Sequence, residues 1–159
     1  MKKTTEVKTL RQYIVAHRRL WDWLAKNPMK DKHDWPGWED NGGTYEFVLS
    51  NCFMCGITVK LRKFLTLDMV LRCRFCPLNW GGVRVSCIDA GTPYWWYANS
   101  RRRLNELSRT KFHSEEEWEQ EMDLAVREVQ LNAMAVRNLP LKRGICYDEF
   151  NKSEVERDI

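Results

Sequence analysis

The stretch Asn51–Gly82, "NCFMCGITVKLRKFLTLDMVLRCRFCPLNWGG", holds four of the chain's six cysteines as two Cys-x-x-Cys pairs. The two pairs are separated by 17 residues, a spacing typical of four-cysteine zinc sites. Each two-residue knuckle turns two thiolates toward one point, and two knuckles complete a tetrahedron around Zn2+. The sequence therefore predicts one zinc ion, and its expected ligands are Cys52, Cys55, Cys73 and Cys76.

Four thiolates close the coordination shell of the metal, so no position is left for water or substrate. We therefore expect a structural zinc ion and no catalytic one. Basic side chains close to the two pairs favour thiolates over thiols; these are Lys60, Arg62, Lys63, Arg72 and Arg74. Cys87 is expected to be a buried strand residue, with replacement of one zinc ligand as the alternative, and Cys146 a free or partly buried thiol.

The chain has 159 residues, 43% of them hydrophobic, which predicts a single α+β domain over residues 1–159 with a core of its own. No apolar run approaches the roughly 20 residues of a membrane span, and the basic start lacks the apolar stretch of a signal peptide. We expect a cytoplasmic protein that binds no membrane. In a reducing compartment its cysteines serve as metal ligands or thiols more often than as disulfides.

Residues 5–26 predict the first of three main helices. Apolar residues recur there at spacings near 3.6, and His17 lies on the same stripe, where we expect it to be partly buried. The helix should end at Asn27-Pro28, because the residue before a proline is disfavoured in helical geometry.

Residues 93–109 and 114–139 predict the other two helices. Pro93 suits the first position of a helix, and Ser114 with Glu117 has the pattern of a capping box. The expected apolar stripe of the second helix consists of Tyr94, Tyr97, Arg101, Leu104 and Leu107. The expected stripe of the third consists of Trp118, Met122, Ala125, Val129, Ala133 and Val136.

The zinc module is predicted to span residues 44–90, with short strands at 44–50 and around Val83–Cys87, where apolar residues alternate. Residues 57–72 fit a hairpin and a short helix equally well, because periodicity does not separate the two in short apolar runs. The tail 147–159 is charged and expected to fray.

Charged residues are distributed unequally along the chain. Residues 1–112 carry 20 basic and 10 acidic side chains, a net charge of +10, whereas residues 113–159 carry 6 and 12, a net charge of −6. This asymmetry indicates either a polyanionic partner for the basic part or pairing of the acidic part with the basic face.

The sequences "NCFMC" and "CRFCPLNWGG", the single Cys87 after them and the closing "AMAVRNLPL" resemble a pattern in small uncharacterised proteins of tailed bacteriophages. The resemblance covers residues 10–140 loosely, and its specific part is the cysteine core. It implies that the four paired cysteines are the zinc ligands and that Pro77, Trp80, Gly81 and Gly82 shape the second knuckle. The tryptophan-containing loop 28–43 and the insert 57–72 depart from the pattern. The resemblance implies a phage accessory protein, located in the host cytoplasm, and no particular activity.

We therefore expect a non-enzymatic, zinc-stabilised interaction protein, such as a phage-type inhibitor of a host defence system or another host protein complex. The eight tryptophans support this expectation, because tryptophan is a frequent anchor of protein interfaces. Two of them, Trp35 and Trp38, stand in the polar loop 28–43, where they either cover the core or contact a partner. The candidate partner-binding residues are Arg18, Arg19, Trp35, Trp38, Lys60, Arg62, Lys63, Arg72, Arg74, Arg101, Arg102 and Arg103.

Two alternative functions are a nucleic-acid-binding module and a metal-dependent nuclease. The basic segment 1–112 contains "PYWWY" close to three consecutive arginines, and aromatic and arginine side chains together bind DNA or RNA by stacking and phosphate contacts. A metal-dependent nuclease would need a general-base histidine, and the chain has only His17, His33 and His113. Since no nucleophile motif or phosphate-binding glycine loop is present, we expect no enzymatic activity.

Overall fold

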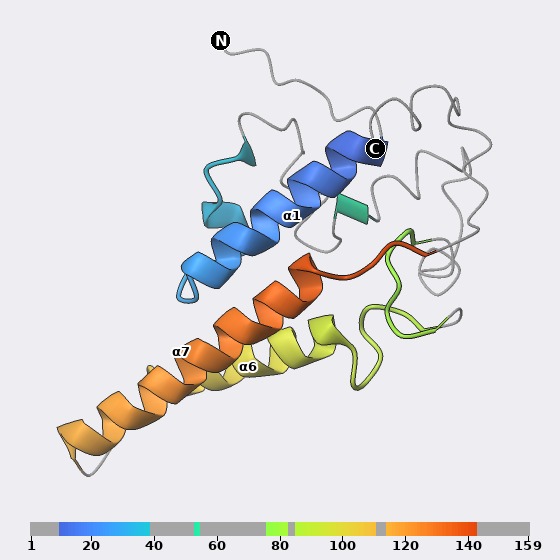
Figure 1. The fold of residues 1–159 in the computed structure, drawn as a ribbon. Helices are drawn as coiled ribbons and strands as arrows, with labels where there is room; N and C mark the ends of the chain where they lie inside the picture. Colours follow the sequence, from blue (N-terminus) through green and yellow to red (C-terminus); the bar gives the residue numbers. More distant parts are fainter. Residues whose placement is uncertain (1–9, 39–52, 55–75, 83–84, 111–113, 143–159) are drawn as a thin grey trace.

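The computed structural model describes residues 10–38, 53–54, 76–82, 85–110 and 114–142 (Figure 1). They form the helices α1 (Leu10–Lys26), α6 (Pro93–Leu107) and α7 (Glu115–Arg137) and the short 3-10 helix η1 (Lys32–Asp34). The prediction of three main helices is thus confirmed. The expected strand at 44–50 and the ambiguous segment 57–72 lie outside the described residues.

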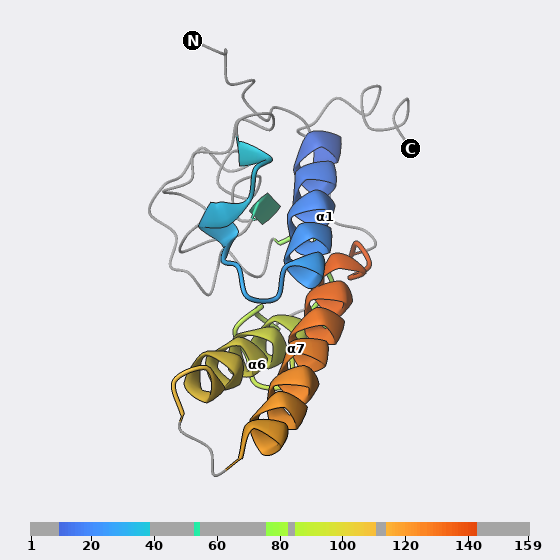
Figure 2. The ribbon, with the colours of Figure 1, turned by 90° about the vertical axis from the view of Figure 1, so that its left-hand side faces the viewer.

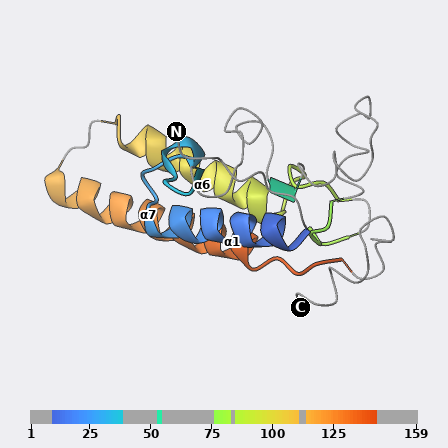
Figure 3. The same ribbon diagram turned by 90° about the horizontal axis from the view of Figure 1, so that it is seen from above.

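Helix α7 packs against both other long helices (Figures 1 and 2). Its C-terminal end meets α1, where Arg137 Nε lies 3.3 Å from Asp22 Oδ1. Farther toward its N-terminus it runs beside α6, as Figure 3 shows from above, and Arg103 reaches across to Glu121. The described core is therefore built between α7 and two different neighbours.

Buried side chains on α7 follow the predicted stripe, since Ala125, Val129, Ala133 and Val136 are all buried. The prediction is wrong for Trp118, whose side chain is 37% exposed. Trp118 lies in the first turns of α7, whereas the contacts with α1 lie at the opposite end of that helix. The apolar periodicity of α7 therefore extends beyond the part of this helix that both α1 and α6 cover.

On α1, the buried side includes Trp21, whose ring meets the Tyr97 ring of α6 edge-on at 4.7 Å between centroids. Edge-to-face aromatic pairs stabilise a fold beyond the area that they bury. This contact joins α1 to α6 within the core. His17, one turn earlier on α1, is only 2% exposed, so it is buried more completely than its position on the stripe predicted.

Capping side chains determine where α6 and α7 begin. The Thr92 hydroxyl accepts a hydrogen bond from the Trp95 N–H, and the Ser114 hydroxyl accepts one from the Glu117 N–H, both at 3.2 Å. These bonds satisfy N–H groups that have no partner inside the helix. Helix α6 ends at Leu107, earlier than predicted, because the chain continues in tight turns in which the Arg109 N–H bonds to the Glu106 carbonyl.

The strand predicted around Val83–Cys87 is absent from its described part, residues 85–87. The chain turns there, because the Asp89 carboxylate accepts hydrogen bonds from both the backbone N–H and the hydroxyl of Ser86. Short polar side chains compete in this way with regular secondary structure. In the parts of the chain that the structure describes, no helix combines the length and the apolar character that crossing a membrane requires.

Candidate functional site

Of the four predicted zinc ligands, the structure describes Cys76; Cys52, Cys55 and Cys73 lie outside the described residues, as does Cys146. The Cys76 side chain is 4% exposed, and its Sγ accepts a hydrogen bond from the Trp80 indole N–H at 3.4 Å. A donor of this kind stabilises a thiolate and orients it, as the outer partners of metal ligands do. The surroundings of Cys76 therefore fit a metal-binding thiolate.

The segment that follows Cys76 is joined to the residues that follow α7. Leu78 and Leu141 form an isolated antiparallel bridge, in which the Asn79 N–H donates to Pro140 and the Lys142 N–H donates to Pro77, both at 2.8 Å. Leu139 and Pro140 follow the end of α7 at Arg137. The residues that follow α7 therefore hold the cysteine segment in place.

The turn after Cys76 needs a glycine. Gly81 has a φ of +113°, a backbone conformation that other residues rarely adopt, and its N–H donates to the Asn79 side chain at 3.1 Å. The role of Gly81 in shaping a zinc knuckle, which the resemblance implies, stays a prediction.

The residues between the first two cysteines are core residues. Phe53 and Met54 are both buried, and the Phe53 ring lies 5.8 Å from Trp35 and 5.4 Å from Trp38, measured between centroids. Trp35 is itself only 5% exposed. A Cβ on Gly37 would lie 2.3 Å from the Trp35 ring, so the chain passes too close for any other residue. The tryptophans of this loop cover the core around the first cysteine pair and leave Trp35 little surface for a partner.

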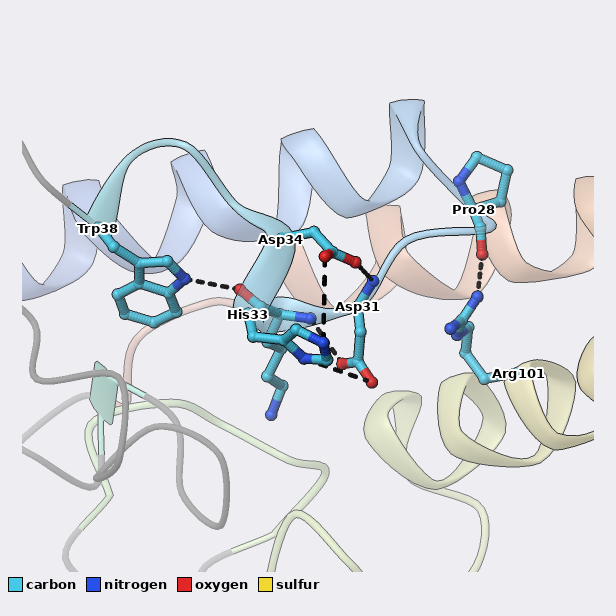
Figure 4. A network of polar contacts seen from close by, with 7 residues as sticks. Pro28, Asp31, His33, Asp34, Trp38 and Arg101 are labelled. Carbon is cyan, nitrogen blue, oxygen red and sulfur yellow. Dashed lines mark hydrogen bonds and ion pairs between the residues drawn. The ribbon is translucent and has the colours of Figure 1, made fainter.

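Figure 4 shows the polar contacts that hold this loop. Asp31 and Asp34 cap η1 reciprocally, and each carboxylate lies 4.0 Å from a ring nitrogen of His33. The hydrogen bond from Asp31 lowers the pKa of Asp34. The Trp38 indole N–H donates to the Lys32 carbonyl at 2.7 Å, and the Arg101 guanidinium donates to the Pro28 carbonyl.

Lys32 is buried between two helices. Its ammonium lies 5.3 Å from the centroid of the Tyr94 ring and 5.8 Å from that of the Trp21 ring, distances at which cation–π attraction operates. The loop is thereby fixed to α1 and α6 together.

Cys87 is half-buried and packs against the core. Its carbonyl accepts a hydrogen bond from the Thr92 hydroxyl at 2.6 Å, and the same hydroxyl caps α6. The chain that leaves the cysteine segment is thus tied to the start of α6. Within the described residues, no group of three or more His, Cys, Asp or Glu side chains is placed to hold a metal ion. This observation does not test the predicted site, three of whose ligands lie elsewhere in the chain.

The three consecutive arginines of α6 have different partners. Arg101 contacts Pro28, and Arg103 contacts Glu121 at 2.9 Å and Glu128 at 3.3 Å. Arg102 is exposed and donates to the Asn99 side-chain oxygen at 2.8 Å. The net charge of +10 on residues 1–112 therefore overstates the positive charge that α6 offers to a partner.

A pair of tryptophans stands in the first turn of α6. The rings of Trp95 and Trp96 meet edge-on, with centroids 4.6 Å apart, and Trp96 is 49% exposed. Neither tryptophan is among the predicted partner-binding residues. Tyr94 and Tyr97 do pack against the core, whereas Trp96 points away from it. The three-residue spacing of Tyr94 and Tyr97, which places both on one side of the helix, was the signal in the sequence that separates the core-packed tyrosines from the exposed Trp96.

The remaining candidates are divided between the surface and the undescribed parts. Arg18 and Arg19 are exposed on α1, and Lys60, Arg62, Lys63, Arg72 and Arg74 lie outside the described residues. His17 Nε2 lies 3.4 Å from the Val136 carbonyl, which can only accept, so His17 is protonated at Nε2. Burial lowers the pKa of His17 to about 4. A neutral histidine enclosed in the core is not a candidate general base.

No protein-family model, curated protein or solved structure matches this chain.

Proposed function

We propose that this protein is a non-enzymatic, zinc-stabilised interaction protein of phage type, which binds and inhibits a host protein or protein complex. The observation that carries the proposal is the half-exposed Trp96, stacked edge-on against Trp95 on a capped helix. An exposed tryptophan offers a large, rigid apolar surface, and such residues dominate the binding energy of many interfaces.

The zinc site contributes to this function by positioning α6. In the proposal, Cys52, Cys55, Cys73 and Cys76 hold the ion, whose role is to fix the two cysteine segments relative to each other. The segment that starts at Cys76 is hydrogen-bonded to the residues that follow α7. The Cys87 carbonyl accepts a hydrogen bond from Thr92, the residue that caps α6. The two tryptophans would then be held on a rigid support, which lowers the entropy cost of binding.

Nucleic-acid binding by the basic segment 1–112 is the alternative. The partners of α6 disfavour it, because Arg103 is paired with two carboxylates and Arg101 is engaged by a backbone carbonyl. Phosphate binding gains most from several basic groups that are not yet neutralised. A metal-dependent nuclease has less support, since His17 is enclosed in the core.

Replacing Trp96 with serine tests the proposal. We expect Trp96→Ser to weaken binding to the partner about thirtyfold or more, the effect of truncating a residue worth about 2 kcal/mol at an interface. The partner is first isolated from a bacterial host lysate on immobilised wild-type protein, and its affinity for each variant is then measured by calorimetry with both components purified.

Met29→Ser is the matched control, since Met29 is an equally exposed apolar residue in a different segment. We expect this variant to bind as the wild type does. Equal affinities of the wild type and Trp96→Ser, or the absence of any protein partner alongside salt-dependent binding of DNA or RNA, would contradict the proposal.

A further inference from the structure

The outer face of α6 carries a hydrogen-bonded row of three residues. Trp95, Asn99 and Arg102 are spaced by four and three positions, so they lie on one side of the helix. The Asn99 side-chain amide donates to the Trp95 carbonyl at 2.8 Å, and Arg102 donates to the Asn99 oxygen at 2.8 Å. Asn99 therefore orients the guanidinium of Arg102 along the same face as Trp95, whose ring contacts that of Trp96.

Arg102 forms no ion pair with a described residue. Its partner Asn99 is an uncharged amide, and no carboxylate pairs with Arg102 within the ranges that the structure covers. The neighbouring arginines, in contrast, are engaged by Pro28 and by the two glutamates of α7. A planar guanidinium held in one orientation is suited to a carboxylate, which it binds through two parallel hydrogen bonds.

We propose that this face binds a peptide segment of the protein partner that presents an apolar side chain and a carboxylate about 10 Å apart. This separation follows from the seven positions that separate Trp95 from Arg102 along α6, at 1.5 Å of rise each. The apolar side chain packs against Trp95 and Trp96, and the carboxylate pairs with Arg102. The inference rests on the proposed function and adds the chemistry of the partner.

The charges around the row favour a single carboxylate over a nucleic-acid strand. Glu106 is exposed and lies four positions after Arg102, on the same face of α6. The adjacent helix α7 contributes Glu121 and Glu128 beside Arg103. A strand with a phosphate at every nucleotide would bring several negative charges close to these carboxylates, whereas one acidic side chain that pairs with Arg102 brings a single negative charge beside Glu106.

A random peptide display library selected against the purified full-length protein tests the inference. We expect the peptides enriched on the wild type to share an aromatic or leucine residue and an Asp or Glu at a fixed separation. Selection on Arg102→Gln, which removes the positive charge and keeps a polar side chain, should retain the apolar residue and lose the acidic one. Circular dichroism verifies that the variant is folded, as expected for an exposed position.

The affinity of a synthetic peptide from the wild-type selection is then measured for the wild type and for Arg102→Gln. We expect the variant to bind this peptide about tenfold more weakly, a ratio that corresponds to about 1.4 kcal/mol. Enriched peptides without an acidic residue, or an acidic preference that persists with Arg102→Gln, would overturn the inference and leave the tryptophan surface standing. Failure to enrich any peptide would overturn both. Binding of a single-stranded DNA oligonucleotide that Arg102→Gln weakens would overturn the assignment to a peptide.

Discussion

Cys76→Ser is expected to remove the bound zinc and to lower the stability of the whole domain. Binding of structural zinc contributes about 10–16 kcal/mol of apparent free energy in zinc-finger peptides, and that energy is folding free energy. This chain also has a helical core, so we expect partial rather than complete unfolding. A loss of at least about 4 kcal/mol would lower Tm by roughly 10 °C in a domain of this size. Zinc content is measured by elemental mass spectrometry and Tm by calorimetry.

The variant Cys87→Ser is the matched control. Cys87 is the other described cysteine, and its contact with Thr92 is made by its backbone carbonyl, which serine keeps. Cys87→Ser should retain zinc and most of the Tm. A chelator should lower the Tm of the wild type and leave that of Cys76→Ser unchanged. Loss of zinc from Cys76→Ser without a change in Tm would contradict a structural role of the metal.

Acidification from about pH 6.5 to pH 4 is expected to destabilise the folded protein through His17. Burial lowers the pKa of His17 to about 4 in the folded state, against an ordinary value of 6.5. The unfolded chain therefore binds a proton that the folded chain does not, and stability is lost as the pH falls through this window. The difference corresponds to about 3 kcal/mol at 1.36 kcal/mol for each pKa unit.

The control for this prediction is His17→Gln, which removes the titration and keeps an N–H donor for the Val136 carbonyl. Urea unfolding at several pH values between 4 and 7 should show a smaller loss of stability for His17→Gln than for the wild type. Zinc release at low pH affects both chains, since they carry the same cysteines, and cancels in the difference. Equal pH dependence of the two proteins would show that His17 is accessible to protons without unfolding.

The helices were predictable because local and tertiary signals agree there. Thr92-Pro93 and Ser114 give the starts of α6 and α7 through side-chain caps, and the stripe that contains Ala125 and Val129 predicts the face that α7 buries. The end of α6 was placed too late, because its last residues form tight turns that composition does not distinguish from a helix.

The remaining errors concern contacts that periodicity does not encode. Asp89 turns the chain through hydrogen bonds to Ser86, so an alternating apolar pattern did not produce a strand in residues 85–87. The partners of the arginines depend on α7 and on the loop before η1, both far away in sequence. The exposure of Trp96 likewise follows from how α6 packs on its neighbours, so the surface that carries the proposed function emerged only from the structure.

We propose that a zinc ion bound by the two cysteine pairs supports this fold. Native mass spectrometry of the intact wild-type protein, purified without added metal or chelator, tests it most directly. The expected result is one zinc ion for each chain, together with the narrow charge-state distribution of a folded protein. A metal-free chain with the same narrow distribution would contradict the claim.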